Sequence, residues 1–446
     1  MTDARAARSR LFFASCLALV VTAMSFAIRG DIMDQLGTQF ALSKEQVGTI
    51  AGTAFWGFTL SIVIGGPLCD ALGMGRLLRL ACLCHLAGIA TTIGAGFMPP
   101  TVEQLAKHEP TAAFWMLFVG TLLIGLANGC IEAACNPLIA TLYADNKAQK
   151  LNHFHVWFPG GIVIGGVLSY LVGQWLAAGN VLANTPAHAW QVKMALMVVP
   201  AILYGALFKG VQFPPTERVA SGTSGGQMIA ACFRPLFVLM LLCMLMTAAT
   251  ELGPNQWIPD ILTSTAGVSG ILVLVWINGL MAIGRQFAGP VVHKLSPTGM
   301  LLMSSVLGAI GLYSLSVANS DIAVFAAATV FALGICYFWP TMLGFVAERV
   351  PRSGALGLAL MGGAGMLSVS AVLPIMGGIY DEKIAAAKQS GLAEAAAKAA
   401  GGAATLQDVV VLPIALAVVF TLLYLGDRRA GGYRAEKLAA AGATAD

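Results

Sequence analysis

The sequence predicts an all-helical membrane protein with twelve spanning helices, arranged as two pseudo-symmetric six-helix bundles. Three observations lead to this fold class. Of the 446 residues, 58% are hydrophobic and only 10% are charged, whereas soluble globular domains average about 25% charged residues. The chain also contains a series of apolar runs of the length that a helix needs to cross a bilayer. Finally, features of the first half of the chain recur in the second half.

The apolar runs define the helices in order along the chain. Each run is continuously apolar and does not alternate with polar residues, which favours helices over barrel strands. The first run follows several arginines and could mimic a secretory signal peptide, but it is too long for one and eleven more runs follow, so we interpret it as a spanning helix. The twelve runs lie near residues 11–36, 46–67, 76–97, 113–141, 153–178, 190–209, 233–262, 268–290, 299–318, 321–347, 355–379 and 408–426.

An internal repeat divides the chain into two halves. The Gly66-Pro67 pair after the second run recurs as Gly289-Pro290 after the eighth run, 223 residues later. We therefore predict an N-terminal bundle over residues 1–210, a cytoplasmic linker over residues 211–232 and a C-terminal bundle over residues 233–446. Two halves that rock about a central site can expose that site to one side of a membrane and then to the other.

The positive charges predict the orientation in the membrane. Most of the 25 Lys and Arg residues lie at the N-terminus, at the C-terminus and in the connections on the same side as these ends. By the positive-inside rule, both termini are expected in the cytoplasm, with the chain in the cell (inner) membrane. No basic, aromatic-interleaved patch indicates a nucleic-acid partner. The sequence has no HExxH, GxSxG or Walker-type motif, so we do not expect an enzyme.

The fourth run carries a carboxylate in an otherwise uncharged segment. Asn128, Glu132 and Asn136 recur every four residues and share one helix face. A carboxylate in the hydrocarbon region is costly, so it is typically functional or protonated. We expect Glu132 to carry a proton and the two Asn side chains to line a polar cavity. The alternative is a buried, hydrogen-bonded carboxyl group that only holds helices together.

The seventh run contains a second polar stripe, followed by two prolines. Glu251 and Asn255 are four residues apart, and the segment 253–259 reads GPNQWIP. The prolines predict a break in the helix that frees backbone carbonyls. Asn255 and Gln256 would then hydrogen-bond a polyol, with Trp257 as a stacking surface. The alternative is an outer helix end with an interfacial Trp.

Charged residues near the outer part of the first run suggest a gate. Arg29 and Asp31 are two residues apart, so their side chains diverge on a helix and do not pair. In the repeat register Arg29 corresponds to Leu252, beside Glu251, and the two helices would face each other. We therefore predict that Arg29 and Glu251 form an ion pair that gates the cavity. Asp31 has a simpler interpretation as a solvated helix end.

Several other side chains complete the predicted site. His155 could relay protons, or it could be a hydrogen-bonded residue at the cytoplasmic end of its helix. Trp276, Asn278, Tyr337 and Trp339 could form an aromatic wall, although aromatic side chains packed between helices are the commoner case.

Three stretches resemble a known superfamily or one of its branches. Gly66, Asp70, Gly73 and Arg76 resemble the loop signature of the major facilitator superfamily, and the resemblance implies that Asp70 and Arg76 latch the cytoplasmic ends of the two halves. The stretches GCIEAACNPLIATLY and KLNHFHVWFPGGIVIGG resemble the fucose, glucose and galactose proton-symporter branch.

This branch resemblance implies a sugar site between the halves, with Glu132 and Asp31 as proton-coupling carboxylates. It also places His155 in the sugar site, while the residues around Trp157 are closer to glucose-type members.

Together these features predict proton-coupled uptake of a sugar, a hexose, by alternating access. The alternatives are a carrier of another polar metabolite, an uncoupled transporter and a drug–proton antiporter. No cofactor is expected beyond the coupling proton. The expected partners are a small-molecule sugar and membrane lipid, and the functional unit is expected to be a monomer. The Ala-rich segment 385–404 is predicted to form a helical external arm.

Overall fold

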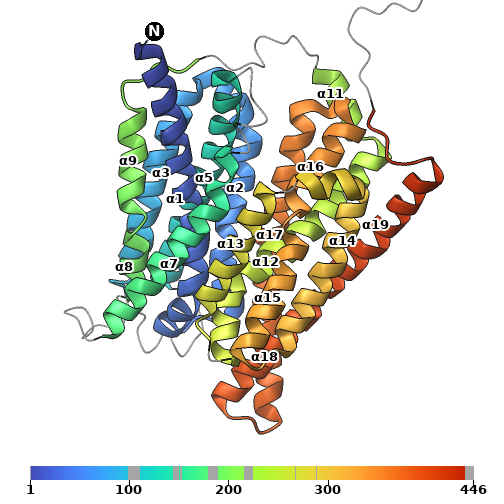
Figure 1. Cartoon of the computed structure of the whole chain (residues 1–446). Coiled ribbons are helices and arrows are strands. Elements are labelled where there is room, and N and C mark those ends of the chain that lie inside the picture. The colour runs from blue at the N-terminus through green and yellow to red at the C-terminus, as the bar shows by residue number, and fades with distance from the viewer. Residues whose placement is uncertain are drawn as a thin grey trace, which may run out of the picture.

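The structure is a computed structural model that describes residues 2–98, 111–143, 150, 153–178, 189–214, 225–266, 268–287 and 289–436. Its first group of helices packs as one bundle and its second group as another (Figure 1). The first contains α1 (Thr2–Phe40), α2 (Lys44–Leu72), α3 (Met74–Ala95), α5 (Ala112–Leu142), α7 (Trp157–Ala177), α8 (Ala189–Ala195) and α9 (Val198–Phe208). The second contains α11 (Gly225–Cys232), α12 (Pro235–Ala266), α13 (Gly270–Gln286), α14 (Gly289–Val317), α15 (Asp321–Ile335), α16 (Phe338–Arg349), α17 (Gly354–Gln389), α18 (Glu394–Val409) and α19 (Val411–Arg429).

Each predicted apolar run coincides with helical structure. Within the described residues, eleven spans are long and apolar enough to cross a membrane, and α13 is a shorter apolar helix at the place of the eighth run. Three spans consist of two consecutive helices each: α8 with α9, α15 with α16, and α18 with α19. The expected all-helical architecture is therefore present along the chain.

The internal repeat is visible in the backbone at two equivalent turns. Gly73, between α2 and α3, has φ 83° and ψ 146°. Ser296, which interrupts α14, has φ 59° and ψ 161° and lies 223 residues later, at the offset of the sequence repeat. A positive φ is costly for a residue with a Cβ, and Pro297 restricts Ser296 further. The same turn is thus made by glycine in one half and by a strained serine in the other.

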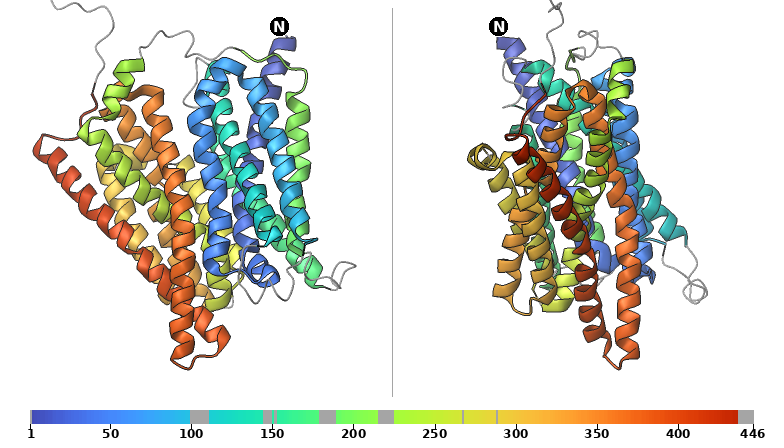
Figure 2. Two further views of the ribbon diagram at one scale, coloured as in Figure 1. Left: turned by 180° about the vertical axis from the view of Figure 1, so that it is seen from behind. Right: turned by 90° about the vertical axis from the view of Figure 1, so that its right-hand side faces the viewer.

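The two bundles are joined at the end of the molecule opposite the N-terminus. Figures 1 and 2 show that the ribbons of the two bundles lie close together at that end and diverge towards the end that bears the N-terminus. Within the described residues, every hydrogen bond and ion pair between the bundles uses residues from 26 to 59 of the first bundle. The bundles are therefore closed at one end, which we call the outer end because the charge distribution predicts that it faces away from the cytoplasm.

Helices α2 and α17 meet along glycines at this end. A Cβ on Gly48 or Gly52 would collide with the carbonyl oxygens of Leu373 and Ser370, and a Cβ on Gly377 would collide with that of Lys44. The two backbones can approach this closely only because glycine occupies these positions.

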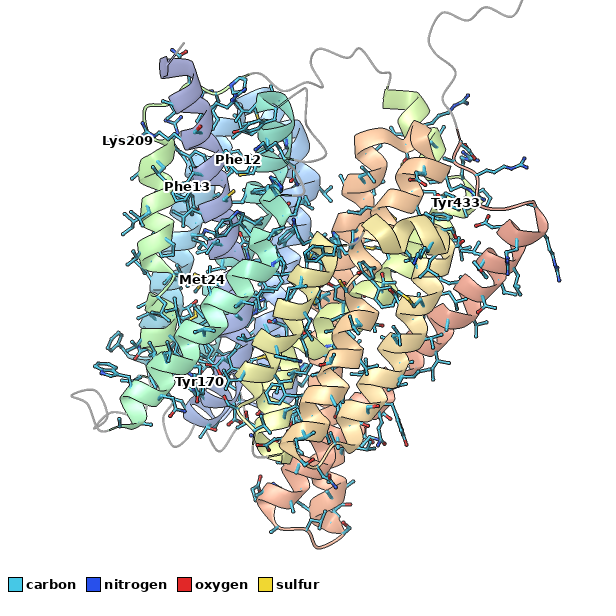
Figure 3. The ribbon with its side chains drawn as sticks, viewed as in Figure 1. Phe12, Phe13, Met24, Tyr170, Lys209 and Tyr433 are labelled. Carbon is cyan, nitrogen blue, oxygen red and sulfur yellow. The ribbon has the colours of Figure 1, made fainter. Side chains whose placement is uncertain are left out.

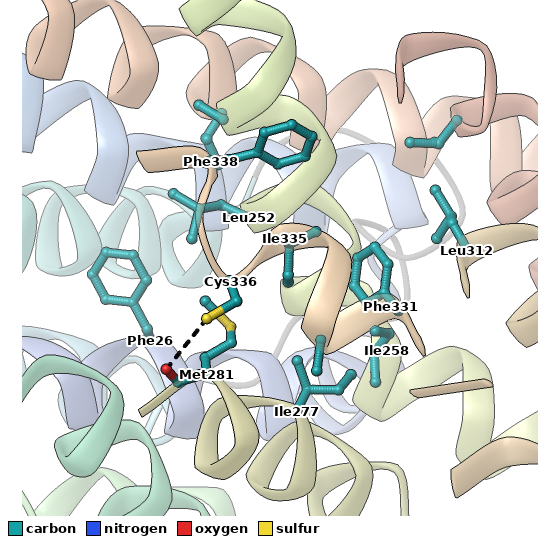
Figure 4. Packing of buried hydrophobic residues seen from close by; sticks show 14 of the residues in the cluster. Phe26, Leu252, Ile258, Ile277, Met281, Leu312, Phe331, Ile335, Cys336 and Phe338 are labelled. Carbon is teal, nitrogen blue, oxygen red and sulfur yellow. Dashed lines mark hydrogen bonds between the residues drawn. The ribbon is translucent and has the colours of Figure 1, made fainter. Parts of the chain in front are cut away.

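The larger apolar cluster crosses the boundary between the bundles. Phe26 from α1 belongs to the same cluster as Leu252, Met281 and Cys336 from the second bundle, and Figure 4 shows these side chains packed around the junction of α1, α12, α13 and α15. A second cluster lies wholly within the first bundle. The junction is thus packed like a protein interior.

The predicted break in the seventh run is wrong. Helix α12 continues through Pro254 and Pro259 for 32 residues. The helix is held by its neighbours, since Gly253 packs against Val372 and Met376 of α17 and Trp257 Nε1 donates to the carbonyl of Leu373 at 3.3 Å. Packing against adjacent helices can compensate for the hydrogen bonds that proline removes.

The Ala-rich segment forms the expected helical arm. Helix α17 runs to Gln389, the chain turns at Gly391 with φ 93°, and α18 packs back against α17. The hairpin projects beyond the outer end in both views of Figure 2. At the other end, Figure 3 places Lys209 and Tyr433 at the same side of the molecule as Phe12. The two ends of the described chain therefore lie on one side.

Candidate functional site

A chain of hydrogen bonds links Glu132 to the start of α7. Asn136 Nδ2 donates to Glu132 Oε2 at 2.8 Å, and His155 Nε2 lies 3.0 Å from Asn136 Oδ1. Because the amide oxygen can only accept, His155 donates from Nε2. Glu132 and Asn136 are half-buried and His155 is exposed. Within the described residues no salt bridge involves Glu132, so this carboxylate is held by an amide and has no cationic partner.

Asn128 has a different role from the predicted one. Its side chain is fully buried. Asn128 Oδ1 accepts from His85 Nε2 at 2.8 Å, and its Nδ2 donates to Ser25 Oγ at 3.2 Å. The opposite nitrogen of His85 lies 3.0 Å from the hydroxyl of Tyr204. This network fastens α1, α3, α5 and α9 together inside the first bundle, so the prediction that Asn128 lines the cavity is wrong.

The helical repeat explains that error. A residue four positions further along a helix is rotated by about 40°, so Asn128 and Asn136 differ by about 80° around α5. That rotation carries Asn128 from the face of Glu132 towards α3. The signal that could have revealed its role is His85, a polar residue within the third apolar run.

At the junction of the bundles, Arg29 contacts Gln256. Arg29 Nε donates to Gln256 Oε1 at 3.0 Å, and Gln256 Nε2 donates to the carbonyl of Phe26 at 3.2 Å. The guanidinium lies over the rings of Phe26 and Phe55, with its carbon 5.0 and 5.1 Å from the ring centroids. Both α1 and α12 thus contribute to one buried polar contact.

The predicted ion pair between Arg29 and Glu251 is wrong. Glu251 Oε1 accepts from Arg285 Nη2 at 3.0 Å, and Arg285 Nε donates to the carbonyl of Cys336 at 3.0 Å. The partner comes from α13 in the same bundle, and Arg29 reaches the amide of Gln256, five residues further along α12. Arg285 lies near the end of the eighth apolar run, and it is not among the site residues predicted from the sequence.

Three polar atoms near this junction have no hydrogen-bond partner among the described residues. They are Arg29 Nη2, Glu251 Oε2 and Asn255 Oδ1, all buried. Buried polar groups are nearly always hydrogen-bonded, so unpaired ones mark sites that a ligand or a second conformation satisfies. Two of the three lie on the stripe that the sequence predicted for α12.

The predicted aromatic wall is only partly present. Trp257 is fully buried, with its ring edge against Tyr380, so its predicted stacking surface is closed. Asn278 is buried and donates to the carbonyl of Leu274 in its own helix. Tyr337 is buried too, and its hydroxyl donates to the carbonyl of Gly284 at 3.1 Å.

Three tryptophans of the predicted site retain access to solvent or lipid. Trp157 and Trp276 are exposed and Trp339 is half-buried. Trp276 Nε1 donates to Thr329 Oγ1 at 2.9 Å. Trp339 packs against Gly365 of α17. These three rings can therefore still contact a solute or lipid, whereas Trp257 and Tyr337 are buried against other residues of the protein.

The outer end is closed by a cluster of charges that the sequence did not reveal. Lys44 Nζ lies 2.6 Å from Asp260 Oδ2 and 3.1 Å from Asp34 Oδ1. Lys398 Nζ lies 2.5 Å from Asp34 Oδ1 and 3.0 Å from Asp260 Oδ1. We call Asp34, Lys44, Asp260 and Lys398 the outer charge cluster; it joins α1 and α2 to α12 and α18.

A fifth charge reinforces this closure. The carboxylate of Asp381 in α17 accepts from the backbone N–H groups of Lys44 and Glu45 at 3.1 and 3.0 Å. These are the first residues of α2, where the helix dipole favours a negative charge. The second bundle thereby caps a helix of the first.

The remaining predicted site residues lie apart from this junction. Asp31 pairs with Lys193 at 2.5 Å and accepts from Ser169 Oγ at 2.6 Å, within the first bundle. Arg76 is exposed at the start of α3. Asp70 belongs to α2, but its side chain lies outside the described part of the structure. The predicted latch between Asp70 and Arg76 therefore stays a prediction.

The sequence profile of the Major Facilitator Superfamily matches residues 11–374. The chain is 23% identical over 432 residues to the gallate transporter of Pseudomonas putida, covering 83% of this chain and 88% of that protein. It is 24% identical over 193 residues to the L-fucose-proton symporter of Escherichia coli (strain K12), covering 40% of this chain and 38% of that protein. For three other curated relatives, the matched part spans between 25% and 33% of their length.

Solved structures give the same fold. A partially occluded inward open conformation of the xylose transporter XylE from E. coli superposes with a TM-score of 0.71 at 14% identity, covering 93% of this chain and 99% of that chain. At this identity the likeness concerns the fold alone.

Proposed function

Because this chain belongs to the Major Facilitator Superfamily, and is therefore a multi-pass secondary transporter rather than an enzyme, we propose that it takes up a hexose-type sugar together with a proton by alternating access. The sugar binds at the junction of α1 and α12, and Glu132 carries the proton. In this proposal the protein lies in the cell membrane with both termini in the cytoplasm, and the outer charge cluster faces the exterior.

One observation carries the proposal of proton coupling. Glu132 lies within a membrane-spanning helix and is held by the amide of Asn136, with no cationic partner in the described part of the chain. A carboxylate fixed by an arginine or lysine keeps its charge, whereas one held by an amide can gain and lose a proton. Asp31 and Glu251 are paired with cations. Of the candidate carboxylates in the site, Glu132 is thus the one best suited to alternate between its protonated and its charged form.

The unpaired acceptors support a hydroxyl-rich solute. Glu251 Oε2 and Asn255 Oδ1 lie on one face of α12 and lack donors. Sugar hydroxyl groups would supply those donors, while an apolar drug would leave both acceptors buried and unsatisfied. This favours sugar uptake over export of apolar compounds.

The coupling would work through the charge of Glu132. Protonation on the outer side removes the cost of a buried charge and permits the bundles to close over the solute. Release on the other side restores the charge. A membrane potential of 100 mV supplies about 2.3 kcal/mol per charge moved, which corresponds to roughly 50-fold accumulation of a neutral solute.

A second candidate is a proton-coupled carrier of another polar metabolite. The alignment with the protein named as a gallate transporter covers far more of the chain than the alignment with the fucose symporter. The coupling argument for Glu132 is the same in both cases, and only the solute differs.

Proteoliposomes that contain a pH-sensitive dye test the proposal. Addition of sugar should acidify the lumen, which the dye reports, and a pH gradient should drive accumulation. Glu132→Gln should abolish accumulation but retain exchange of labelled solute across the membrane. Asp408→Asn is the matched control, since Asp408 forms only a partly exposed pair with Lys383. Full pH-driven accumulation by Glu132→Gln would exclude this residue as the proton carrier.

A further inference from the structure

Arg29 is a buried cation without a counter-charge. Its side chain is 6% exposed, its Nε contacts the neutral amide of Gln256, and its Nη2 has no partner. The rings of Phe26 and Phe55 flank the guanidinium. Within the described residues no carboxylate forms a salt bridge with Arg29. A buried charge is normally paired, because aromatic faces and one amide do not replace a counter-ion.

The neighbouring charges do not compensate for it. Glu251, five residues before Gln256 on α12, is already paired with Arg285. Asp31, two residues from Arg29, is paired with Lys193. Once Glu132 is protonated for transport, the polar centre of the molecule is left with one unbalanced positive charge.

The unpaired atoms at the junction define a complementary ligand. Arg29 Nη2 is a donor on a cation, and Glu251 Oε2 and Asn255 Oδ1 are acceptors. The exposed fraction of both Glu251 and Asn255 is 4%. A ligand that satisfies all three atoms carries an anionic oxygen for Arg29 and hydroxyl groups for the two acceptors. A neutral sugar would fill the acceptors but leave the charge of Arg29 unbalanced.

We infer that the transported solute is a polyhydroxylated carboxylate, with its carboxylate on Arg29 and its hydroxyl groups on Glu251 and Asn255. This inference rests on the proposed function: it keeps the proton coupling and the site, and it changes the solute from a neutral sugar to a sugar acid or a hydroxylated aromatic acid. Arginine is suited to this role because its planar guanidinium matches a carboxylate and stays charged when buried.

The inference has an electrical consequence. A neutral sugar that moves with one proton carries one positive charge across the membrane, whereas a carboxylate that moves with one proton carries none. Uptake of one acid molecule with one proton is therefore independent of the membrane potential.

The first test is ligand-induced stabilisation of the purified full-length protein in detergent. The probes are D-glucuronate against D-glucose, D-galacturonate against D-galactose, and 3,4,5-trihydroxybenzoate against 1,2,3-trihydroxybenzene, with acetate as the control for charge alone. At least one hydroxy acid should raise the unfolding temperature more than its neutral analogue and more than acetate. The pair that responds separates a sugar acid from an aromatic acid.

Variants of Arg29 supply the residue-specific test. Arg29→Gln should weaken binding of the responding acid by about 10- to 100-fold, and Arg29→Lys should weaken it less. The matched control is Arg352→Gln, which removes an exposed arginine and should leave binding unchanged. If Arg29→Gln does not fold, Arg29→Lys and the acid–neutral comparison in the native chain still decide the question.

Transport in liposomes with an imposed potassium diffusion potential separates this inference from the proposed function. Uptake of the acid with protons and without dependence on potential supports both. A neutral hexose that binds as well as its acid, or that enters with protons at a rate increased by an inside-negative potential, overturns the inference and upholds the proposed function. Uptake of an acid without proton movement overturns proton coupling but upholds the acid site. A lack of response to every acid overturns the inference.

Discussion

Lys398 Nζ of α18 lies 2.5 Å from Asp34 Oδ1 of α1, 364 residues earlier in the chain. The contact joins an arm outside the second bundle to the first helix of the other bundle. Its lysine also contacts Asp260, which Lys44 approaches from the opposite side. The outer end is therefore closed by alternating charges from four helices.

Removal of the lysines should loosen this closure to different degrees. Lys44→Gln should shift the protein towards an outward-open state more than Lys398→Gln, because Lys44 is the more buried of the two and also donates to Asp260 at the shorter distance. Partly exposed pairs contribute about 0.2–1 kcal/mol, so Lys398→Gln alone should change the equilibrium by less than about 5-fold. Distance measurements between spin labels on the two bundles would report the shift. Equal effects of both changes would contradict the ranking.

A second prediction concerns the glycine contacts between α2 and α17. Gly52→Ala places a methyl group against the carbonyl of Ser370, so the outward-closed state should be disfavoured and uptake should fall severalfold. The control is Gly344→Ala in α16, where an added methyl group meets nothing within 4 Å. Initial uptake rates, normalised to the amount of folded protein, give the comparison. Normal uptake by Gly52→Ala would show that the closed contact is not needed in the cycle.

The ion pair of Glu251 and Arg285 should behave as a unit. Breaking a buried pair by removing one partner costs about 3–5 kcal/mol, because the other charge is left uncompensated. Glu251→Gln and Arg285→Gln should each destabilise the protein, and the double variant should recover much of the loss. Denaturant or thermal unfolding in detergent measures the coupling. Strictly additive losses would mean that the two side chains do not interact.

The network of Asn128 and His85 should matter for stability and not for coupling. Asn128→Ala leaves His85 Nε2 without its acceptor in a fully buried position, at a cost of about 1–3 kcal/mol. The folded variant should still couple proton and solute movement. Unfolding experiments and the proton-to-solute ratio in liposomes test the two parts separately. Loss of coupling at normal stability would return Asn128 to the transport pathway.

The helices could be predicted from the sequence because an apolar run of sufficient length is a local property. The repeat of Gly66-Pro67 as Gly289-Pro290 is also readable from the sequence, and its offset recurs at the turns of Gly73 and Ser296. Glu132 and Asn136 could be grouped because they lie one turn apart on a helix, whereas the contact of His155 with Asn136 was not predicted.

The partners across helices could not be predicted in the same way. Whether Arg29 meets Glu251 or Gln256 depends on the axial offset between α1 and α12, and a shift of five residues moves the contact by about 7.5 Å. The continuous course of α12 through two prolines depends on its packing against α17. The outer charge cluster draws on four helices, and no spacing within the sequence brings them together.

Because both bundles share an apolar cluster, the equilibrium between the closed and the separated outer end should depend on temperature. Separation of the outer end would expose surface around Phe26 and Leu252 that is now covered. The hydrophobic stabilisation gained by burying such surface becomes weaker as the temperature falls. Cooling should therefore favour the alternative arrangement of the bundles, and the protein should dwell with its outer side shut for longer as it warms.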